Sequence, residues 1–469
     1  MDRRTLLLAG LSAIPASFLP KSHAQELSVE KVSILVVGSG AAGLSAALSA
    51  LENGANSVLI LEKLPFVGGH SIFSSGSVAS ESTPQGIAAM RQDMLTAGLN
   101  LNNPDLVNVL CTNAHAARMW LASYGLIWKP EPFQAVGSTA VRSYSTGSAQ
   151  AGYDYVQLLN ESVRRYGAQI RFRTRAETLI YDEDPMRITG VLATNPDGSR
   201  TLIQARAVIL ATGGFQADSQ MRARFCPNID PQMRTTANPT GLLLDGATGD
   251  GIVMAERLNA KLVDTQYMQI LPFAGGRLLD YAGGEIWLNV LGERFVNEGT
   301  VSFSSLYSVI EKQPDQVMWA ISDSKSKKGA TLGLKLHQGI VKLADSVEEL
   351  AKGMDISSTV LKQTLDRYNK SVVNNYDSQF DLPFKAETID TPPYYYGKET
   401  FSLHYCCGGI AIDTKARVLN TNDRVIFGLY ASGEVTGGVH GADRLGGHSL
   451  IDCFVFGRIA GAHAAMIAT

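Results

Sequence analysis

Three glycines, Gly38, Gly40 and Gly43, stand between an apolar run and a helix-like segment of small residues. Gly38 permits a tight turn, Gly40 lets the backbone approach a pyrophosphate, and Gly43 lets a helix pack closely on a strand. The N-terminus of the following helix then presents free N–H groups to the phosphates. The spacing therefore predicts a dinucleotide site built on a strand, a turn and a helix.

An acidic residue and further glycine pairs indicate which dinucleotide is bound. Glu62 ends a second apolar run, at 58–61, where a carboxylate accepts hydrogen bonds from a ribose. A Gly-Gly loop at 68–69 follows, and such a loop lets the backbone wrap a long, extended cofactor. Strands that run into glycine recur at 208–215 and 428–434. Because FAD enzymes assemble their site from such distant pieces, the pattern favours FAD over a nicotinamide cofactor.

Three later blocks of sequence carry a family resemblance. Residues 246–251 read Gly-Ala-Thr-Gly-Asp-Gly, residues 431–447 run from Ala-Ser-Gly-Glu to Arg-Leu-Gly-Gly, and residues 449–450 are Ser-Leu. These blocks resemble the fumarate reductase/flavocytochrome c flavoprotein family, of the FAD-dependent oxidoreductase 2 type. The resemblance extends from about Val32 to the C-terminus.

The resemblance implies an α/β fold, in which a doubly wound, Rossmann-like FAD-binding domain is interrupted by an α+β capping domain. We expect the FAD-binding domain at 25–264 and 405–469 and the capping domain at 265–404, with the active site between them. Helical apolar spacing from 348 to 368 fits the capping domain, and 391–396 is a plausible hinge.

The resemblance also implies where FAD is contacted. Asp250 would anchor FAD through hydrogen bonds, with a surface turn as the alternative. His70 stands where membrane-bound relatives attach FAD covalently and soluble relatives carry asparagine, and we expect an ordinary hydrogen-bonding histidine there. The implied FAD contacts are Gly38, Gly40, Ala41, Ala42, Gly43, Glu62, Lys63, Gly69, His70, Ser71, Ser75, Gly76, Gly213, Asp250, Tyr405, Glu434, Ser449 and Leu450.

On the substrate side, His404 matches one substrate histidine of the family and Arg444 matches its carboxylate-binding arginine, with Gly447 close by. Cations that bind a carboxylate polarise a conjugated C=C bond and hold it against flavin N5. The alternatives are a packed histidine at 404, and a salt bridge from Arg444 to Asp443 or Glu434.

The chain also departs from the family pattern. The position of the family's proton-donating arginine falls near Ser302, where this chain has no arginine. The positions of the glutamate and the arginine of the family's proton pathway fall near Leu278 and Tyr281, and leucine stands in place of the second substrate histidine, at Leu271. Fumarate is therefore disfavoured, and a monocarboxylate or a larger apolar substrate is favoured. A reduction then needs another acid, for which Tyr281, Tyr307 and Tyr405 are candidates, while Ser302 alone would be a poor acid.

Three functions remain open at this point. The leading hypothesis is a reductase of an activated C=C bond, with electrons from a separate cytochrome c, because the chain has no Cys-x-x-Cys-His haem motif. The second is a dehydrogenase of the 3-ketosteroid dehydrogenase type, and the third is a flavoprotein that only carries electrons. The export signal predicted at residues 1–24 and the retained Arg444 favour the reductase. The loss of the proton-donating arginine favours the dehydrogenase.

The composition is that of a large α/β enzyme of two or three domains. The 469 residues are 45% hydrophobic, include 45 glycines and carry a formal net charge of −3, which argues against a nucleic-acid binder. Five cysteines without regular spacing predict neither a disulfide framework nor a metal site. The adjacent Cys406 and Cys407 could form a strained disulfide, but we favour two buried thiols.

The first 24 residues resemble an export signal. Arg3 and Arg4 precede an apolar stretch from Leu6 to Leu19, and Ser22-His23-Ala24 offers a cleavage site. The paired arginines resemble the twin-arginine signal, which exports proteins already folded around a cofactor. The apolar stretch is short for a membrane anchor. We therefore expect a periplasmic protein, with no membrane span after the signal is removed.

Overall fold

The computed structural model describes residues 28–468, except positions 136, 147, 149–150, 183–186, 239–240, 272–274, 280, 302, 330–331 and 384. The predicted export signal and Ser302 lie outside the described residues.

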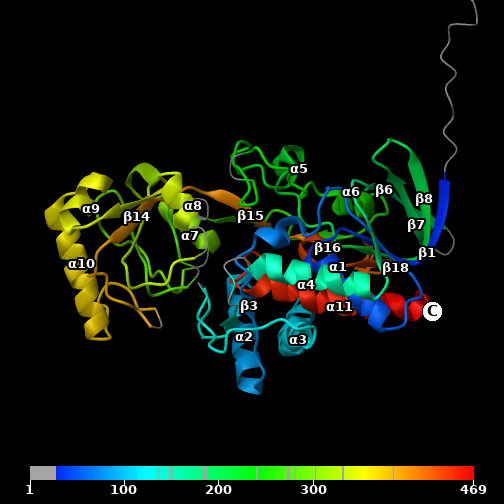
Figure 1. The fold of residues 1–469 in the computed structure, drawn as a ribbon, viewed down its shortest axis with the longest axis horizontal. Coiled ribbons are helices and arrows are strands. Elements are labelled where there is room, and N and C mark those ends of the chain that lie inside the picture. Colours follow the sequence, from blue (N-terminus) through cyan, green and yellow to red (C-terminus); the bar gives the residue numbers. More distant parts are fainter. Residues whose placement is uncertain are drawn as a thin grey trace, which may run out of the picture.

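A large sheet forms one end of the molecule (Figure 1). Its eight strands follow the order β17-β18-β7-β8-β1-β2-β5, with β6 paired to β7. Strands β18, β8, β1, β2 and β5 run parallel to one another, while β6, β7 and β17 add antiparallel pairs. Their bounds are β1 (Ser28–Val37), β2 (Val58–Leu61), β5 (Gln169–Arg171), β6 (Arg175–Asp182), β7 (Arg187–Thr194), β8 (Arg200–Leu210), β17 (Arg417–Leu419) and β18 (Val425–Ala431).

Burial explains why the central strands read as continuous apolar runs. Residues 34–37, 58–61 and 207–210 are all buried, because helices cover the parallel part of the sheet. The predicted strand, turn, helix and strand are thus β1, α1 (Ala41–Glu52) and β2. This parallel arrangement confirms the expected doubly wound α/β fold.

The last helix, α11 (His448–Ala468), packs lengthwise on α1 (Figure 1). A Cβ added at Gly457 would lie 2.7 Å from the carbonyl oxygen of Ala42, and one at Gly461 would lie 2.1 Å from that of Ala46. These glycines therefore let the two helices approach closely. By length and apolar composition α11 could cross a membrane, but 61% of its most apolar stretch is buried, as in the core helix of a globular domain.

Three of the other helices near the large sheet begin at a residue whose side chain caps the helix. Thr83 caps α2 through Gly86 N–H, Asn103 caps α3, and Asp218 caps α5 through the N–H groups of the first turn. Their bounds are α2 (Pro84–Ala97), α3 (Pro104–Ser123), α4 (Ala151–Arg165), α5 (Ser219–Phe225) and α6 (Asp250–Glu256), with short 3-10 turns η1 (Gly69–Phe73) and η3 (Gly433–Val435).

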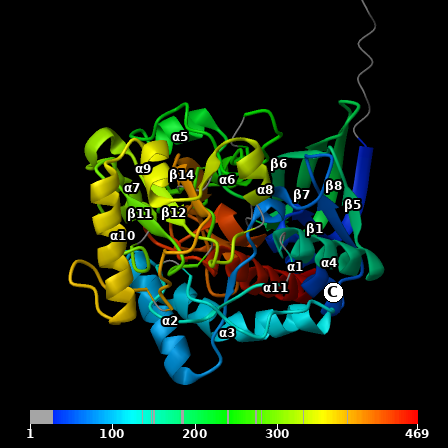
Figure 2. The ribbon, with the colours of Figure 1, turned by 60° about the vertical axis from the view of Figure 1, so that its left-hand side comes forward.

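A second sheet lies at the opposite end of the molecule, covered by α9 and α10 (Figures 1 and 2). Its strand order is β11-β12-β14-β13, and every neighbouring pair is antiparallel. All of its strands fall within the capping domain expected at 265–404, whose boundaries stay predictions. The elements are β11 (Ile286–Leu288), α7 (Phe303–Ile310), η2 (Pro314–Gln316), β12 (Trp319–Ser322), α8 (Leu332–His337), β13 (Val341–Ala344), α9 (Val347–Met354), α10 (Ser358–Val373) and β14 (Tyr394–Lys398).

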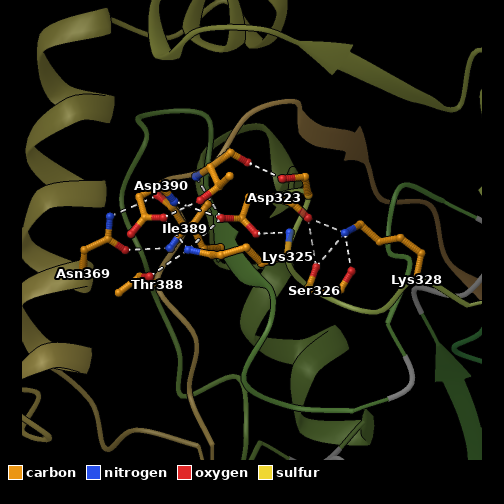
Figure 3. Close-up of polar contacts among 10 residues, drawn as sticks. Asp323, Lys325, Ser326, Lys328, Asn369, Thr388, Ile389 and Asp390 are labelled. Carbon is orange, nitrogen blue, oxygen red and sulfur yellow. Dashed lines mark hydrogen bonds and ion pairs between the residues drawn. The ribbon is translucent and has the colours of Figure 1, made fainter.

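A polar network fastens the end of β12 to the segment that leads into β14 (Figure 3). The Asp323 carboxylate accepts hydrogen bonds from the backbone N–H groups of Asp390 and Thr391, both at 3.0 Å. Lys325 Nζ bridges Asp323 and Asp390, and Lys328 Nζ donates to the Asp323 carbonyl. These contacts fix the loop after β12 against the neighbouring segment.

Short strands connect the two ends. Antiparallel β10 pairs with β15, which sets Gln269 opposite Tyr405, the residue after His404. The remaining strands are β3 (Val78–Ala79), β4 (Ser143–Tyr144), β9 (Leu262–Val263), β10 (Met268–Leu271), β15 (Ser402–Cys406), β16 (Gly409–Ala411) and β19 (Thr436–Gly437).

Candidate active site

The glycine turn after β1 has the geometry that its spacing predicts. Gly38 has a φ of 106°, and a Cβ there would lie 2.3 Å from the carbonyl oxygen of Ala211 at the end of β8. A Cβ on Gly43 would lie 2.0 Å from the Gly38 carbonyl oxygen, so Gly43 sets the contact between helix and strand. Gly43 does not line the cavity described below, because its role is packing.

Gly40 differs from Gly38 and Gly43, because no protein atom crowds the position that its side chain would occupy. The nearest heavy atom to a Cβ added at Gly40 is Ser71 Oγ at 3.6 Å, and the residue adopts ordinary extended backbone. Ala41 N–H at the start of α1 points to Ser71 Oγ at 3.1 Å. Gly40 and the helix N-terminus therefore leave a cradle of the kind that a pyrophosphate fills.

Glu62 is buried at the end of β2 beside this turn. Its Oε2 accepts hydrogen bonds from Ser39 N–H at 3.1 Å and Ser39 Oγ at 2.6 Å, and its Oε1 accepts one from Leu64 N–H at 2.8 Å. These bonds fix the carboxylate at the cavity wall, where a ribose hydroxyl can still donate to its remaining lone pairs.

An ion cluster stands next to Glu62. The Asp250 carboxylate contacts Lys63 Nζ at 3.0 Å and an Arg175 nitrogen at 2.8 Å. Burial alone would raise the pKa of Asp250, but the charges and hydrogen bonds of Lys63 and Arg175 outweigh it and lower that pKa. Asp250 is therefore an ionised residue of the cavity wall and not a surface turn.

His70 lies in a chain of hydrogen bonds along the same cavity. Its Nε2 is 2.6 Å from Asp245 Oδ1, and its Nδ1 is 3.1 Å from the side-chain nitrogen of Gln216. That nitrogen also donates to Glu434 Oε1 at 3.0 Å, and Cys406 N–H donates to the same oxygen at 2.9 Å. Burial would lower the pKa of His70, but the hydrogen bond and charge of Asp245 raise it overall.

One continuous cavity unites these groups with the expected substrate side chains. Of the predicted FAD contacts, all but Gly43 line it. They are Gly38, Gly40, Ala41, Ala42, Glu62, Lys63, Gly69, His70, Ser71, Ser75, Gly76, Gly213, Asp250, Tyr405, Glu434, Ser449 and Leu450. Of the predicted catalytic residues, His404, Arg444 and Gly447 line it as well.

Arg444 is buried at the substrate end of the cavity. One guanidinium nitrogen donates to Gln269 Oε1 at 2.7 Å and the other to the Leu445 carbonyl at 3.0 Å, and the guanidinium carbon lies 5.1 Å from the Tyr405 ring centroid. Neutral partners therefore orient this cation without cancelling its charge.

His404 stands on β15 beside Arg444. Its Nδ1 is 2.9 Å from Thr236 Oγ1, which fixes the ring. Burial lowers the pKa of His404 well below its usual value, and the nearby charges of Arg444 and His70 lower it further. The imidazole is therefore neutral, and it can take part in a hydrogen bond to a substrate without adding a charge.

The candidate proton donors named from the sequence are mostly displaced from the cavity. Tyr281 does not line it; its phenol oxygen accepts a bond from Lys327 N–H, and burial, with Glu387, raises its pKa to about 12. Tyr307 is also outside the lining and packs edge-on against Phe401, with centroids 4.9 Å apart. Tyr405 does line the cavity, although burial raises its pKa well above the usual value.

Arg277 is a cavity residue that sequence reasoning missed. It lies in the segment after β10 and lines the cavity together with Leu271, His404 and Arg444. Its Nε is 3.5 Å from Glu285 Oε1, and both side chains are buried. The available signal was an arginine next to Leu278, with a glutamate shortly after it.

The cysteines behave as the composition suggests. All five are free thiols, and Cys406 and Cys407 are buried without a disulfide between them. Cys406 Sγ instead lies 3.3 Å from Phe215 N–H, close to the Gln216 chain.

Comparison with known proteins identifies the family of this chain. The model of the FAD binding domain family matches residues 33–450. "Fumarate reductase (cytochrome)" of Shewanella frigidimarina is 33% identical over 93% of this chain and 77% of its own length. "Urocanate reductase" of Eggerthella lenta is 32% identical over 93% and 75%. The "Acrylate reductase flavoprotein subunit" of Shewanella woodyi is 30% identical over 96% and 95%.

Solved structures give the same fold. The open conformation of a flavocytochrome c3 fumarate reductase matches with a TM-score of 0.70 and 30% identity, over 94% of this chain and 79% of the other. A 3-ketosteroid-Δ4-(5α)-dehydrogenase from Rhodococcus jostii RHA1 matches with a TM-score of 0.72 over 95% and 99%, and at 22% identity it shows the fold alone.

Proposed function

The chain belongs to the FAD binding domain family of flavoprotein oxidoreductases, and from this premise we propose that it reduces the activated C=C bond of an unsaturated carboxylate. FAD is its cofactor, and the enzyme acts on CH–CH groups. The observation that carries the proposal is that Arg444 and His404 share one cavity with the glycine turn.

The chain's residues fit FAD. The open side of Gly40 and the N-terminus of α1 would hold the pyrophosphate, and Glu62 would hold the adenosine ribose. When bound and reduced, FAD supplies the hydride from its N5. The protein therefore has to bind the substrate, activate the alkene and deliver a proton.

Arg444 and His404 would bind and activate the substrate. A buried guanidinium forms strong, charge-assisted hydrogen bonds with a carboxylate, and it stabilises the negative charge that develops when hydride adds to the conjugated alkene. Gln269 and Thr236 hold these two side chains in place, so little reorganisation is required during the reaction.

An apolar wall favours a substrate with a single carboxylate. Leu271 lines the cavity, is 3% exposed and packs with Trp287 and Leu306. A second carboxylate placed there would lose hydration without a new partner, which is unfavourable. Arg277, which also lines the cavity, has Glu285 Oε1 3.5 Å from its Nε. The urocanate and acrylate reductases among the relatives are consistent with such a substrate.

A second candidate is a dehydrogenase that removes hydrogen from a saturated ketone. Tyr405 in the cavity favours it, because a tyrosine close to Arg444 could take part in proton transfer. The reductase is preferred because Arg444 presents a buried cation that a neutral ketone does not require.

We place the enzyme in the periplasm, with a c-type cytochrome as electron donor. The paired Arg3 and Arg4, the apolar stretch after them and the cleavage pattern at 22–24 support export. A relative named for a cytochrome-linked fumarate reductase supports the donor.

Anaerobic reoxidation of the viologen-reduced holoenzyme tests the proposal. The panel contains acrylate, urocanate, aromatic acrylates, enones and fumarate, and absorbance reports the flavin. Rapid oxidation by an unsaturated monocarboxylate, and slower oxidation by fumarate, is the expected result. If no alkene oxidises the flavin, the reductase is wrong, and flavin reduction by a saturated ketone would then identify the dehydrogenase.

A further inference from the structure

A cluster of buried charges lies behind the substrate end of the cavity, on the side of the second sheet. Its members are Arg277, Glu285, Lys335 and Glu399, and each is at most 8% exposed. Only Arg277 of the four lines the cavity. The cluster therefore reaches the substrate through this one side chain.

Glu285 is held directly behind Arg277. Its Oε1 accepts a hydrogen bond from the Trp287 indole at 2.8 Å, and its Oε2 accepts one from Leu278 N–H at 3.1 Å. The guanidinium carbon of Arg277 lies 5.4 Å from the Trp287 ring centroid, and its Nε lies 3.5 Å from Glu285 Oε1. The carboxyl and the guanidinium are thus a fixed pair.

The backbone of the arginine is anchored as well. Lys335 Nζ, from α8, donates to the Arg277 carbonyl at 2.6 Å. A Cβ added at Gly275 would lie 2.5 Å from Glu399 Cα, so the segment before Arg277 lies directly against the end of β14. This close approach brings the Glu399 carboxyl into the same buried cluster.

Burial disfavours the ionised form of both carboxyls. Burial raises the pKa of Glu285, and the nearby Arg277 and Lys335 only partly oppose it. Burial raises the pKa of Glu399 well above its usual value, and the charge of Glu285 raises it further. Arg277, Lys335, Lys328 and Tyr281 are the titratable groups facing this pair.

We infer that Arg277 gives the substrate its proton, and that Glu285 and Glu399 are the buried carboxyls that restore a proton to Arg277. This inference rests on the proposed reductase function. It gives the chain an acid although Ser302 stands at the position where the family carries its arginine, and although Tyr281 and Tyr307 lie outside the cavity.

Hydride adds to the alkene carbon β to the substrate carboxylate, and its electron pair forms the new C–H bond. The π electrons of the alkene then take a proton from an Arg277 N–H at the α carbon, and the N–H electron pair stays on the guanidine. A protonated carboxyl of the cluster returns a proton to Arg277, and solvent reprotonates that carboxyl. Transfer from a guanidinium is downhill, because a carbanion beside a carboxylate is a far stronger base than guanidine.

The test compares R277Q, R277K and E285Q holoenzymes with the wild type in two anaerobic reactions. One is reoxidation by the best alkene, and the other is reoxidation by ferricyanide, which takes electrons but needs no proton on carbon. R277Q should slow the alkene reaction about 100-fold or more, with the KM and the ferricyanide rate little changed. R277K should recover part of the rate of the alkene reaction. E285Q should slow the alkene reaction less than R277Q does, and it should change the pH dependence of that rate.

E298Q is the matched control. Glu298 forms a buried ion pair with Arg294 in the same region, at 2.7 Å, and does not line the cavity. This variant shows what the loss of a buried carboxylate costs in stability and in bound FAD. A wild-type alkene rate in R277Q, or a rise in KM with an unchanged kcat, would overturn the inference, since the latter identifies Arg277 as a carboxylate-binding residue.

An infrared measurement separates failure of the inference from failure of the proposed function. The wild type should show the C=O stretch of a protonated carboxyl at neutral pH, and E285Q or E399Q should lose or shift it. If the wild type reduces an alkene but lacks this band, Glu285 and Glu399 are not the carboxyls that restore a proton to Arg277, and the reductase function stands. If no alkene reacts, the reductase is wrong and the proton-donor role is wrong with it.

Discussion

His70 Nε2 lies 2.6 Å from Asp245 Oδ1, and the other ring nitrogen of His70 lies 3.1 Å from the Gln216 side-chain nitrogen. Both nitrogens of this cavity histidine are therefore engaged by the protein. A covalent bond to the flavin would require one of these nitrogens, and hence the loss of a buried hydrogen bond.

The first prediction is that FAD is bound without a covalent link. Acid precipitation of the holoenzyme should release all of the flavin into the supernatant, and the mass of the denatured chain should be that of the polypeptide alone. A polypeptide that stays yellow after precipitation, with a mass raised by one FAD, would contradict this. The H70A variant is the control, because it cannot form the bond.

The second prediction concerns acid stability. Burial would raise the pKa of Asp245, but His70, Thr235 and the Ala247 N–H lower it from 3.8 to about 2. Because the folded pKa is depressed, the stabilisation is complete above the unfolded value and is lost as pH falls from about 4 to about 2. It amounts to about 2 kcal/mol at most.

Denaturant unfolding of the holoenzyme, followed by circular dichroism between pH 6 and pH 2, measures this contribution. The D245N variant should be less stable than the wild type at pH 6, and the difference should shrink as the pH falls. The exposed Asp182, changed to Asn, is the control and should leave the pH dependence unchanged. A difference between D245N and wild type that is constant with pH would contradict the assignment.

The sequence predicts a contact of this site well when the two residues lie close together in the chain, and poorly when they are far apart. Gly38, Gly40 and Glu62 were predictable, because a strand, a turn and a helix fix their geometry within one short segment. The contact of His70 with Asp245 joins residues 175 positions apart and has no local signature.

Arg277 was missed for the same reason. The role that we propose for it involves Glu399, which the packing of the segment around Gly275 against the end of β14 brings close. Tyr281 and Tyr307 were reasonable candidates by residue type, but the fold directs them to Lys327 and Phe401 instead. Residue type indicates which chemistry is available, whereas tertiary packing decides which side chains reach the cavity.

The third prediction is that Arg444 recognises the substrate carboxylate. Removing one partner of a buried charge pair costs about 2–5 kcal/mol, so R444Q should lose at least tenfold in kcat/KM for an unsaturated acid. The neutral amide or enone of the same skeleton should lose much less. Steady-state kinetics on the acid and its amide give the comparison, and bound FAD per chain checks the fold. Equal losses for both substrates would mean that Arg444 acts only by supporting the cavity wall.

The fourth prediction is that the arginine pair directs export. Changing Arg3 and Arg4 to lysine together should leave the precursor in the cytoplasm, folded and containing FAD, because the twin-arginine route requires that pair. Cell fractionation with immunoblotting and flavin fluorescence measures the outcome. Lys21→Gln, near the cleavage pattern, is the control and should still be exported. Unchanged periplasmic protein in the double variant would refute the twin-arginine assignment.

The fifth prediction separates a glycine needed for FAD from one needed for the fold. A methyl group at Gly40 meets no protein atom closer than 3.6 Å, whereas one at Gly43 would lie 2.0 Å from a backbone oxygen. G40A should therefore fold with an unchanged apoprotein melting temperature. It should bind FAD about 10- to 100-fold more weakly, because the methyl group occupies the pyrophosphate cradle at a cost of about 1–3 kcal/mol.

G43A should instead melt earlier even without FAD, since helix and strand must move apart. Fluorescence titration of the apoprotein with FAD and thermal melting give both quantities for each variant. G333A is the control, because Gly333 has open space around it and no positive φ. If G40A binds FAD like the wild type, the pyrophosphate does not lie at this turn, and the cofactor site must be reassigned along the cavity.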